Sequence, residues 1–407
     1  MNVAEVICLF GPEEVHSGAV KVVLDTVECL EQLGHDVSIF SGVRGMRQPA
    51  DEPVKRHWPG RHTWWSIDIT KGLRVDSIEN YHNDRATKAF SSFLDKIRPD
   101  VVHFHAIQGL GAGLVQHALD QGLPVVVHMH DWWWFCPYLF LTTPDGKMCE
   151  FPVTVSSCNC FDNPTFLQKR QEYLRQVVER VNIISCVSRF HQRTLVNLGV
   201  RPTSLSLCEN SVAPFDNVQC KQHKSRGRLR MAYLGGPTVH KGFYLLREAV
   251  RFLKGRWDLR YYGFELSRRT YWRARILAAG RWPKEIMGPR YLRQDLPKLL
   301  AKTDLVIIPS VALESFSLVC REALVLGVPV LAARCGGPEE VLVHGKNGWL
   351  FRRGDPLDLR ESLCSLLVQP GLIKEAKAYL RDNPFQPCSM DLYGQRVNKI
   401  LTKACNL

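Results

Sequence analysis

The segment Asp304–Val343, DLVIIPSVALESFSLVCREALVLGVPVLAARCGGPEEVLV, decides the fold, because it contains two buried strands, each followed by a helix. Leu305–Ile308 is a short apolar run of the kind found in parallel sheets, and Pro309 ends it. Apolar residues then recur at helical spacing over 316–326, and 328–333 is the second apolar strand. This order of elements predicts a doubly wound α/β domain.

Two carboxylates follow the first of these strands. Glu314 lies in the loop before the helix, and Glu322 lies one to two turns inside it. Ligands of open α/β sheets bind outside the carboxyl ends of the strands, where helix N-termini point. The backbone N–H groups of Phe316, Ser317 and Leu318 would suit a phosphate there. Carboxylates beside an anion site indicate a ligand that also carries hydroxyls, such as a nucleotide sugar, and two solvated glutamates are the alternative.

The same segment resembles the donor-binding signature of retaining family 4 glycosyltransferases, which have the GT-B fold. The matching features are D-x4-P-S in DLVIIPS, E-x7-E in ESFSLVCRE, and the G-V-P-V strand with its G-G-P-x-E turn. The resemblance implies an α/β protein of two Rossmann-like doubly wound parallel-sheet domains that face a cleft. It also implies a catalytic role for Glu314 and nucleotide binding by Glu322.

The implied activity is transfer of a hexose from a nucleoside diphosphate sugar to a hydroxyl of a glycan or lipid-linked acceptor, with retention of configuration. Polysaccharide or glycolipid biosynthesis is the expected setting. A catalytically impaired sugar-binding subunit and another GT-B enzyme, such as a nucleotide-sugar epimerase, are the alternatives. The sequence has no D-x-D motif, so we expect no metal or other cofactor in catalysis.

The loop YLGGPTVHKGF supplies a further donor residue. Its Lys241 matches the family's K-G lysine, which binds the donor diphosphate as a point charge. The family usually has an arginine soon after the first glycine, but Gly236 or Pro237 occupies that position here. His240 or Arg334 could replace it, and the departure gives weight to the impaired subunit.

The segment PVVVHMHDWWWFCP resembles the acceptor side of the family. His130 ends a strand there, and a neutral imidazole could accept from a hydroxyl or stabilise positive charge, so we assign it a catalytic role. Asp131 and Trp132 are assigned to the acceptor side. Consecutive tryptophans suit sugar stacking or a membrane interface, and core packing is the alternative. Gly18, at a helix start, corresponds to the family's glycine-rich loop and is assigned to donor binding.

Three further histidines lie near this strand. His105 ends the previous strand and either lines the pocket on the acceptor side or is a core histidine. His103 lies in the same layer. His128 is expected to face the other side of the strand from His130 and to be structural.

Four of the 14 cysteines fall within a short loop after His130. They are Cys136, Cys149, Cys158 and Cys160. A loop of about thirty residues has too little apolar content to fold alone, and four thiolates suit a structural zinc. Disulfides or redox-active thiols, and unlinked buried cysteines, are the alternatives.

The chain of 407 residues is long enough for two domains. We expect an N-terminal acceptor-side Rossmann-like domain over 1–215, a C-terminal nucleotide-sugar-binding Rossmann-like domain over 216–385, and a last helix over 386–407 that crosses back to the first domain. The polar, basic run 217–230 is the natural boundary.

The net charge of +13 predicts an anionic partner. No nucleic-acid-binding motif is present, so a nucleotide or an anionic membrane surface is favoured over nucleic acid. The basic stretch 267–293, with two tryptophans, could lie on anionic lipid, or it could be an ordinary solvated helix. No run is long enough to span a bilayer and no signal peptide is evident. We therefore expect a cytoplasmic protein, either free or peripheral on the inner face of the membrane.

Overall fold

A computed structural model describes the chain from Met1 to Leu407 apart from residues 15–16, 46–51, 59–61, 150–156, 159, 162, 213–214, 216–226 and 265–284. The chain divides into two compact units. Unit 1 comprises Met1–Leu141, Cys149–Ser211 and Cys388–Leu407, and unit 2 comprises Thr142–Met148 and Val212–Pro387. Each unit is built around its own, mainly parallel sheet.

The sheet of unit 1 has eight strands in the order β3-β4-β2-β1-β5-β6-β7-β8. All neighbours pair parallel except the edge pair β3 and β4. The strands are β1 (Asn2–Leu9), β2 (Asp36–Val43), β3 (Val54–His57), β4 (Thr63–Asp68), β5 (Val101–Phe104), β6 (Val125–Met129), β7 (Ile183–Cys186) and β8 (Leu205–Leu207). The central strands β5, β6 and β7 are wholly buried, as expected of a parallel sheet that is covered on both faces.

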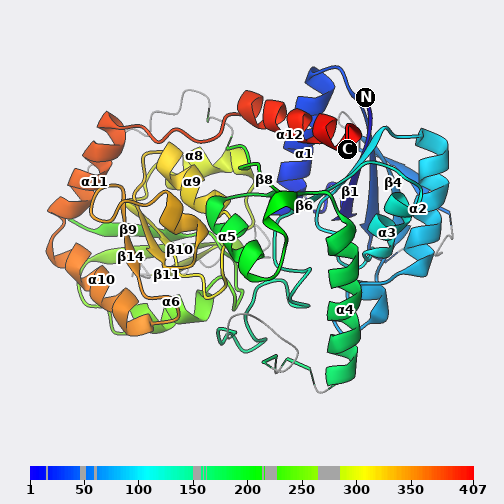
Figure 1. Cartoon of the computed structure of the whole chain (residues 1–407). Coiled ribbons are helices and arrows are strands. Elements are labelled where there is room, and N and C mark those ends of the chain that lie inside the picture. Colours follow the sequence, from blue (N-terminus) through cyan, green and yellow to red (C-terminus); the bar gives the residue numbers. More distant parts are fainter. Residues whose placement is uncertain are drawn as a thin grey trace. The chain divides into compact units, whose positions relative to one another are not determined.

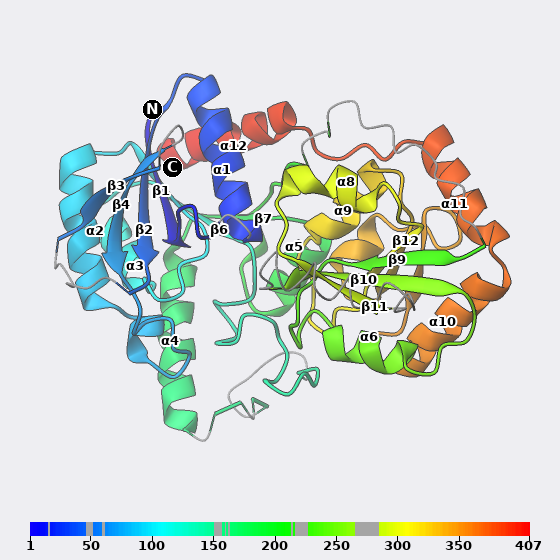
Figure 2. The ribbon, with the colours of Figure 1, turned by 180° about the vertical axis from the view of Figure 1, so that it is seen from behind.

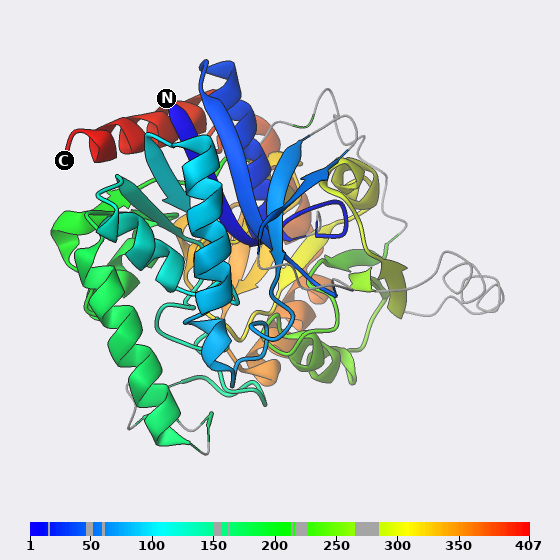
Figure 3. The ribbon, with the colours of Figure 1, turned by 90° about the vertical axis from the view of Figure 1, so that its right-hand side faces the viewer.

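Helices cover both faces of this sheet. The first helix, α1 (Gly18–Gln32), lies beside the last, α12 (Met390–Cys405), on one face (Figures 1 and 2). On the other face lies α2 (Asp84–Ile97) (Figure 3). Its Phe90 packs against Phe40 of β2, with ring centroids 5.3 Å apart. The remaining helices are η1 (Ile78–Asn80), α3 (Gly113–Asp120), α4 (Pro164–Arg180), α5 (Arg189–Asn197) and η2 (Pro202–Ser204).

The C-terminal helix is fixed to unit 1 by apolar and polar contacts. Tyr393 is fully buried among residues of α1 and the sheet, and its hydroxyl lies 2.7 Å from Oγ1 of Thr26. The two ends of the chain are neighbours, because Sγ of Cys405 lies 3.9 Å from Sδ of Met1. Residues from Cys388 onward therefore belong to the first unit.

The sheet of unit 2 has six parallel strands in the order β11-β10-β9-β12-β13-β14. They are β9 (Leu229–Tyr233), β10 (Trp257–Phe264), β11 (Glu285–Pro289), β12 (Leu305–Ile308), β13 (Val330–Ala333) and β14 (Gly348–Phe351). The helices are α6 (Phe243–Val250), η3 (Arg293–Asp295), α8 (Leu296–Leu300), α9 (Leu318–Val325), η4 (Gly337–Glu340), α10 (Pro356–Val368) and α11 (Gly371–Asp382). Apolar clusters lie on both faces of the sheet.

The structure divides the chain after Ser211, whereas the sequence suggested a boundary after residue 215. The second unit extends to Pro387 and includes the separate segment Thr142–Met148, which no composition signal marked. Among the helices that the structure describes, none is long and apolar enough to cross a membrane.

Candidate active site

The loops that follow three neighbouring strands of unit 2 are joined by backbone hydrogen bonds. The backbone N–H of Glu314, after β12, donates to the carbonyl of Cys335, after β13, at 2.7 Å. The carbonyl of Glu314 accepts from Gly337 N–H at 2.8 Å. The carbonyl of His240, after β9, accepts from the N–H groups of Val311 and Ala312, both at 3.0 Å. These bonds hold the carboxyl edge of the sheet in one arrangement.

Two residues allow or strengthen the junction of these loops. Gly242 has φ +75°, and a Cβ there would lie 1.8 Å from the carbonyl oxygen of Pro309, so only glycine lets the two loops approach. Arg321 is buried, and its guanidinium lies 3.7 Å from the ring centroid of Phe316 and donates to that residue's carbonyl. It also forms an ion pair with Glu340 at 3.6 Å and donates to the carbonyl of Gly337 at 3.4 Å. No sequence pattern singled out this arginine.

Lys241 and Glu314 meet at this edge. Nζ of Lys241 lies 2.8 Å from Oε1 of Glu314, and the hydroxyl of Ser310 donates to the same oxygen at 2.5 Å. The lysine side chain is 38% exposed and the glutamate side chain 10%. Burial alone would raise the pKa of Glu314, but the lysine and the two hydrogen bonds lower it. The site therefore presents an ionised carboxylate beside a partly exposed ammonium.

The N-terminus of α9 lies directly after this carboxylate. Phe316 and Ser317 are buried and Leu318 begins the helix. Ser317 has φ +62°, in the left-handed region that a serine rarely adopts, and such backbone strain is concentrated at functional sites. In the described part of the chain, the N–H groups of these three residues make no backbone–backbone hydrogen bond. They retain the capacity to bind an anion.

Glu322 lies inside α9, as expected, with only 3% of its surface exposed. Its Oε1 is 3.5 Å from Nε of Arg293. Burial, and then the charge of Glu322, raise the pKa of Tyr291, whose hydroxyl donates to the carbonyl of Leu234 at 3.1 Å. Arg293 was counted from sequence among the residues of a solvated basic stretch, but it is an ionic partner of this buried carboxylate.

The structure gives a reason why Gly236 does not carry the arginine that the family usually has after the first glycine of this loop. Gly236 has φ +65°, and a Cβ at this position would lie 2.9 Å from the carbonyl oxygen of Gly263. A side chain would therefore strain the loop in this conformation. The suggested replacement His240 is unsuitable as a cation, because burial and then Lys241 lower its pKa to about 4.

Two arginines remain near this edge. Arg334 forms an ion pair with Glu339 at 3.5 Å. Arg353, two residues beyond β14, has a buried Nη1 with no hydrogen-bond partner among the described residues. Burial lowers the pKa of Arg353, while the charges of Cys335 and Glu339 raise it. Arg353 is the stronger candidate for a second anion-binding cation, and sequence reasoning missed it.

The histidine assigned to the acceptor side stands in unit 1, one residue beyond β6. Nε2 of His130 lies 2.8 Å from Nδ1 of His105. Burial, followed by the charges of neighbouring histidines, holds the pKa of His130 well below its usual value. The imidazole is therefore neutral, as its assigned role requires. His105 is almost fully buried and supports His130, so it does not line a pocket.

At the end of β6 the structure corrects the prediction for His128 and adds contacts for Asp131. His128 does not face away from His130, because residues two apart on a strand share a face, and the two rings stack with centroids 4.6 Å apart. Asp131 accepts from the N–H of Trp133 at 2.9 Å. Burial raises the pKa of Asp131 to about 6, while that hydrogen bond and Arg170 lower it.

The consecutive tryptophans are core side chains. Trp132 and Trp133 are each 1% exposed and Trp134 is 5% exposed, so none offers a ring face for stacking on a sugar. Nε1 of Trp133 donates to Oδ1 of Asn80 at 3.0 Å, and the guanidinium of Arg170 lies 5.3 Å from its ring. Core packing, which the sequence analysis gave as the alternative, is therefore the role of these tryptophans in the structure.

Gly18 is the first residue of α1 and is exposed in unit 1. Its assignment to donor binding stays a prediction. The most basic stretch, 267–293, lies outside the described residues up to position 284, and its contact with lipid also stays a prediction.

The four clustered cysteines all belong to unit 1. Burial, followed by Cys136 and Cys158, raises the pKa of Cys149 to about 11, while a hydrogen bond with Cys160 lowers it. Burial and Cys158 raise the pKa of Cys160 to about 12. The four thiols therefore lie close enough to influence one another. Their binding of zinc stays a prediction.

Two glycosyltransferase family models together match most of the chain. A model described as Glycosyltransferase Family 4 matches residues 16–214, and one described as Glycosyl transferases group 1 matches residues 228–369. N-acetyl-alpha-D-glucosaminyl L-malate synthase of Bacillus anthracis is 33% identical over 94 residues, which are 23% of this chain and 24% of that protein. The chain thus matches about a quarter of the length of this curated relative.

Solved structures share the whole fold. HepE of Anabaena in complex with UDP-glucose superposes with a TM-score of 0.64 at 15% identity, covering 99% of this chain and 100% of that one. Sucrose-phosphate synthase of Thermosynechococcus elongatus gives a TM-score of 0.67 at 14% identity, covering 99% of each chain. The two parallel-sheet α/β units have the GT-B fold, and the chain belongs to the family 4-type glycosyltransferases.

Proposed function

We propose that this glycosyltransferase moves a hexose from a nucleoside diphosphate sugar to a hydroxyl of a glycan or lipid-linked acceptor, with retention of configuration, in polysaccharide or glycolipid biosynthesis. The observation that carries the proposal is the contact of Lys241 with Glu314 beside the N-terminus of α9. One cation, one carboxylate and an anion-binding helix end together fit a ligand that has both phosphates and sugar hydroxyls. HepE, with the same fold, was solved with UDP-glucose, so uridine is the first base to test.

In this proposal each group has one task. Lys241, Arg353 and the N–H groups of 316–318 bind the diphosphate and stabilise its charge as the glycosyl bond breaks. Glu314 accepts hydrogen bonds from the sugar hydroxyls, and Glu322 accepts them from the ribose. Retention would follow from attack on the face that the phosphate leaves, with a phosphate oxygen taking the acceptor's proton.

In the same proposal His130, in unit 1, acts as a neutral imidazole that accepts from a hydroxyl or stabilises positive charge on the sugar. Its low pKa supports this form at neutral pH. No residue of the proposed mechanism requires a divalent metal.

The test is release of nucleoside diphosphate from a panel of nucleotide sugars, in EDTA, with and without glycan acceptors. We expect turnover in EDTA and a product anomer that matches the donor. Loss of turnover in EDTA that magnesium or manganese specifically restores would contradict the assignment of charge stabilisation to Lys241 and the helix end. Binding of a donor without turnover on any acceptor would favour the second candidate, a sugar-binding subunit, which the loss of the family arginine at Gly236 supports.

A further inference from the structure

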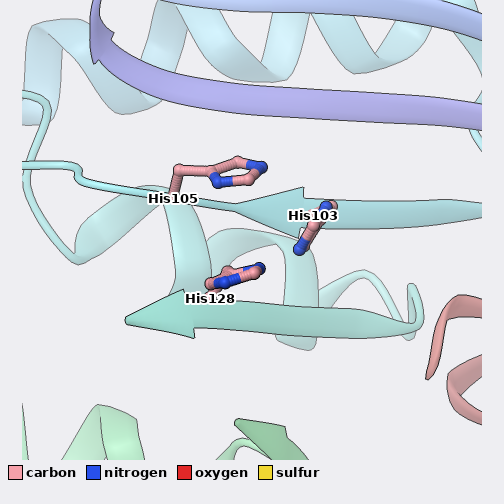
Figure 4. Close-up of side chains that lie close together, drawn as sticks. All are labelled: His103, His105 and His128. Carbon is pink, nitrogen blue, oxygen red and sulfur yellow. The ribbon is translucent and has the colours of Figure 1, made fainter. Parts of the chain in front are cut away.

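Unit 1 contains a group of buried histidines beneath His130. His103 and His105 stand at the end of β5 and His128 stands on β6, and they offer ring nitrogens that all lie within 4.8 Å of one another. Figure 4 shows the three rings gathered at these neighbouring strands. Each residue is 1% exposed. His103 pairs with Val126 in the parallel ladder. Since side chains two residues apart share a face, His103, His105 and His128 lie on the same face of the sheet.

A carboxylate sets the protons of two of these rings. Glu5 is fully buried, its Oε1 lies 3.0 Å from Nδ1 of His103, and its Oε2 lies 2.7 Å from Nε2 of His105. It accepts an N–H from each ring, which leaves a lone pair on Nε2 of His103. Metal-bound histidines usually donate their other N–H to a carboxylate in this way. Nδ1 of His105 lies 2.8 Å from Nε2 of His130, and a bound metal would replace that hydrogen bond.

His128 has no hydrogen-bond partner for either ring nitrogen among the described residues. A neutral imidazole carries one N–H donor and one lone pair, so burial leaves both unsatisfied, at a cost to folding. Its ring stacks on His130 at 4.6 Å and lies 5.3 Å from the ring of His105. A cation among these rings would give the lone pair of His128 a partner.

A buried carboxylate lies against two of these rings. The ionic partners of Glu5 in the described part of the chain are His103 and His105. A buried carboxylate is costly unless it is paired, so a cation bound among these rings would compensate the charge of Glu5.

We propose that His103, His105 and His128 bind a divalent transition-metal ion, with Glu5 orienting two of the rings. Imidazole ligands suit zinc and its neighbours in the first transition row. Zinc–nitrogen bonds of about 2.1 Å in a tetrahedral site separate the nitrogens by about 3.4 Å, so no pair must close by more than about 1.4 Å from the present limit of 4.8 Å. This site is separate from the proposed donor residues of unit 2 and from the cysteine cluster.

Zinc binding by the whole protein is the first test. Full-length protein purified without a metal-affinity tag is stripped with a chelator and then titrated with zinc against a chromogenic chelator. X-ray absorption of the loaded protein should show nitrogen ligands at about 2.0–2.1 Å, whereas zinc on the cysteines would show sulfur at about 2.3 Å. Wild-type protein that takes up no zinc, or only sulfur-ligated zinc, overturns the proposal.

Substitutions test whether the metal binds at these residues. His128→Phe keeps an aromatic ring and removes the two unpartnered nitrogens, so it should fold and lose the nitrogen-ligated zinc. Glu5→Gln should weaken zinc binding by about 10- to 100-fold. His191→Phe is the matched control, because His191 is equally buried with an unpartnered Nε2 but lies outside the group, and it should retain the zinc. Retention of nitrogen-ligated zinc by His128→Phe would overturn the proposal. If that variant does not fold, the absorption spectrum of the wild type decides.

Discussion

Replacement of Glu314 by glutamine isolates the charge of the proposed sugar-binding carboxylate. The variant keeps the size of the side chain and an acceptor oxygen for Lys241 and Ser310, whose donors lie 2.8 and 2.5 Å from Oε1. Hydrogen bonds to a charged group are worth about 1.5–3 kcal/mol, and those between neutral groups about 1 kcal/mol. Neutralising the hydrogen bonds that Glu314 accepts from two sugar hydroxyls in the proposed site therefore removes about 3 kcal/mol, or roughly a hundredfold in turnover.

The effect of Glu314→Gln on stability should be small. The lysine is 38% exposed, and ion pairs with such a partner are worth about 1 kcal/mol at most, or about 2–4 °C in Tm for a domain of this size. The lowered pKa of Glu314 means that its contribution is present above the unfolded pKa of about 4.3 and is lost as the pH falls through the folded value. The difference in Tm between variant and wild type should therefore vanish in acid.

The assay is nucleoside diphosphate release at saturating donor, with a thermal melt of each variant. Glu361→Gln is the matched control, an exposed glutamate of α10 in the same unit, and it should leave turnover unchanged. Turnover of Glu314→Gln within about threefold of wild type would refute the catalytic assignment, since the expected loss is about a hundredfold. A fall in Tm near 10 °C would show that the residue holds the fold instead.

Three further predictions concern single groups. Glu322→Gln should weaken binding of free nucleotide by about tenfold in calorimetry, the loss of one charged hydrogen bond, and unchanged affinity would remove Glu322 from the ribose site. Arg353→Gln should weaken nucleoside diphosphate binding by about tenfold but leave nucleoside binding unchanged. The exposed neighbour Arg352→Gln is its control, and equal losses in both variants would argue against a specific role. Asp131→Asn should gain in Tm over wild type as the pH rises from about 4 to 8, because a carboxyl whose folded pKa is raised to about 6 loses stability on ionising, and a constant difference in Tm would contradict that burial cost.

The strands of the second sheet could be predicted from the sequence because each is a local apolar run. Leu305–Ile308 was predicted as a strand with the bounds that the structure has. The following helix begins two residues later than expected, since Ser317 adopts a left-handed conformation that the helical spacing does not reveal. The placement of Glu314 in a loop and Glu322 within the helix followed from the same periodicity.

Contacts between segments that are distant in the chain could not be predicted from the sequence. The pairing of Arg293 with Glu322, and the unpartnered Nη1 of Arg353, depend on how separate loops meet at the sheet edge. The tryptophans after His130 are buried by residues as distant as Asn80 and Arg170, which composition cannot show. The error on His128 had another cause, since the period of two along a strand already required it to share the face of His130.

The most direct test of the central claim is a thermal melt of the protein with a panel of nucleotide sugars, compared with Lys241→Ala. A ligand that binds the native state at a hundred times its Kd stabilises it by about 2.7 kcal/mol, or roughly 5–10 °C in a domain of this size. We expect at least one nucleoside diphosphate hexose to raise the Tm of the wild type by this amount, and Lys241→Ala to lose most of the shift. No shift with any nucleotide sugar, or an equal shift in Lys241→Ala, would contradict a donor site at Lys241 and Glu314.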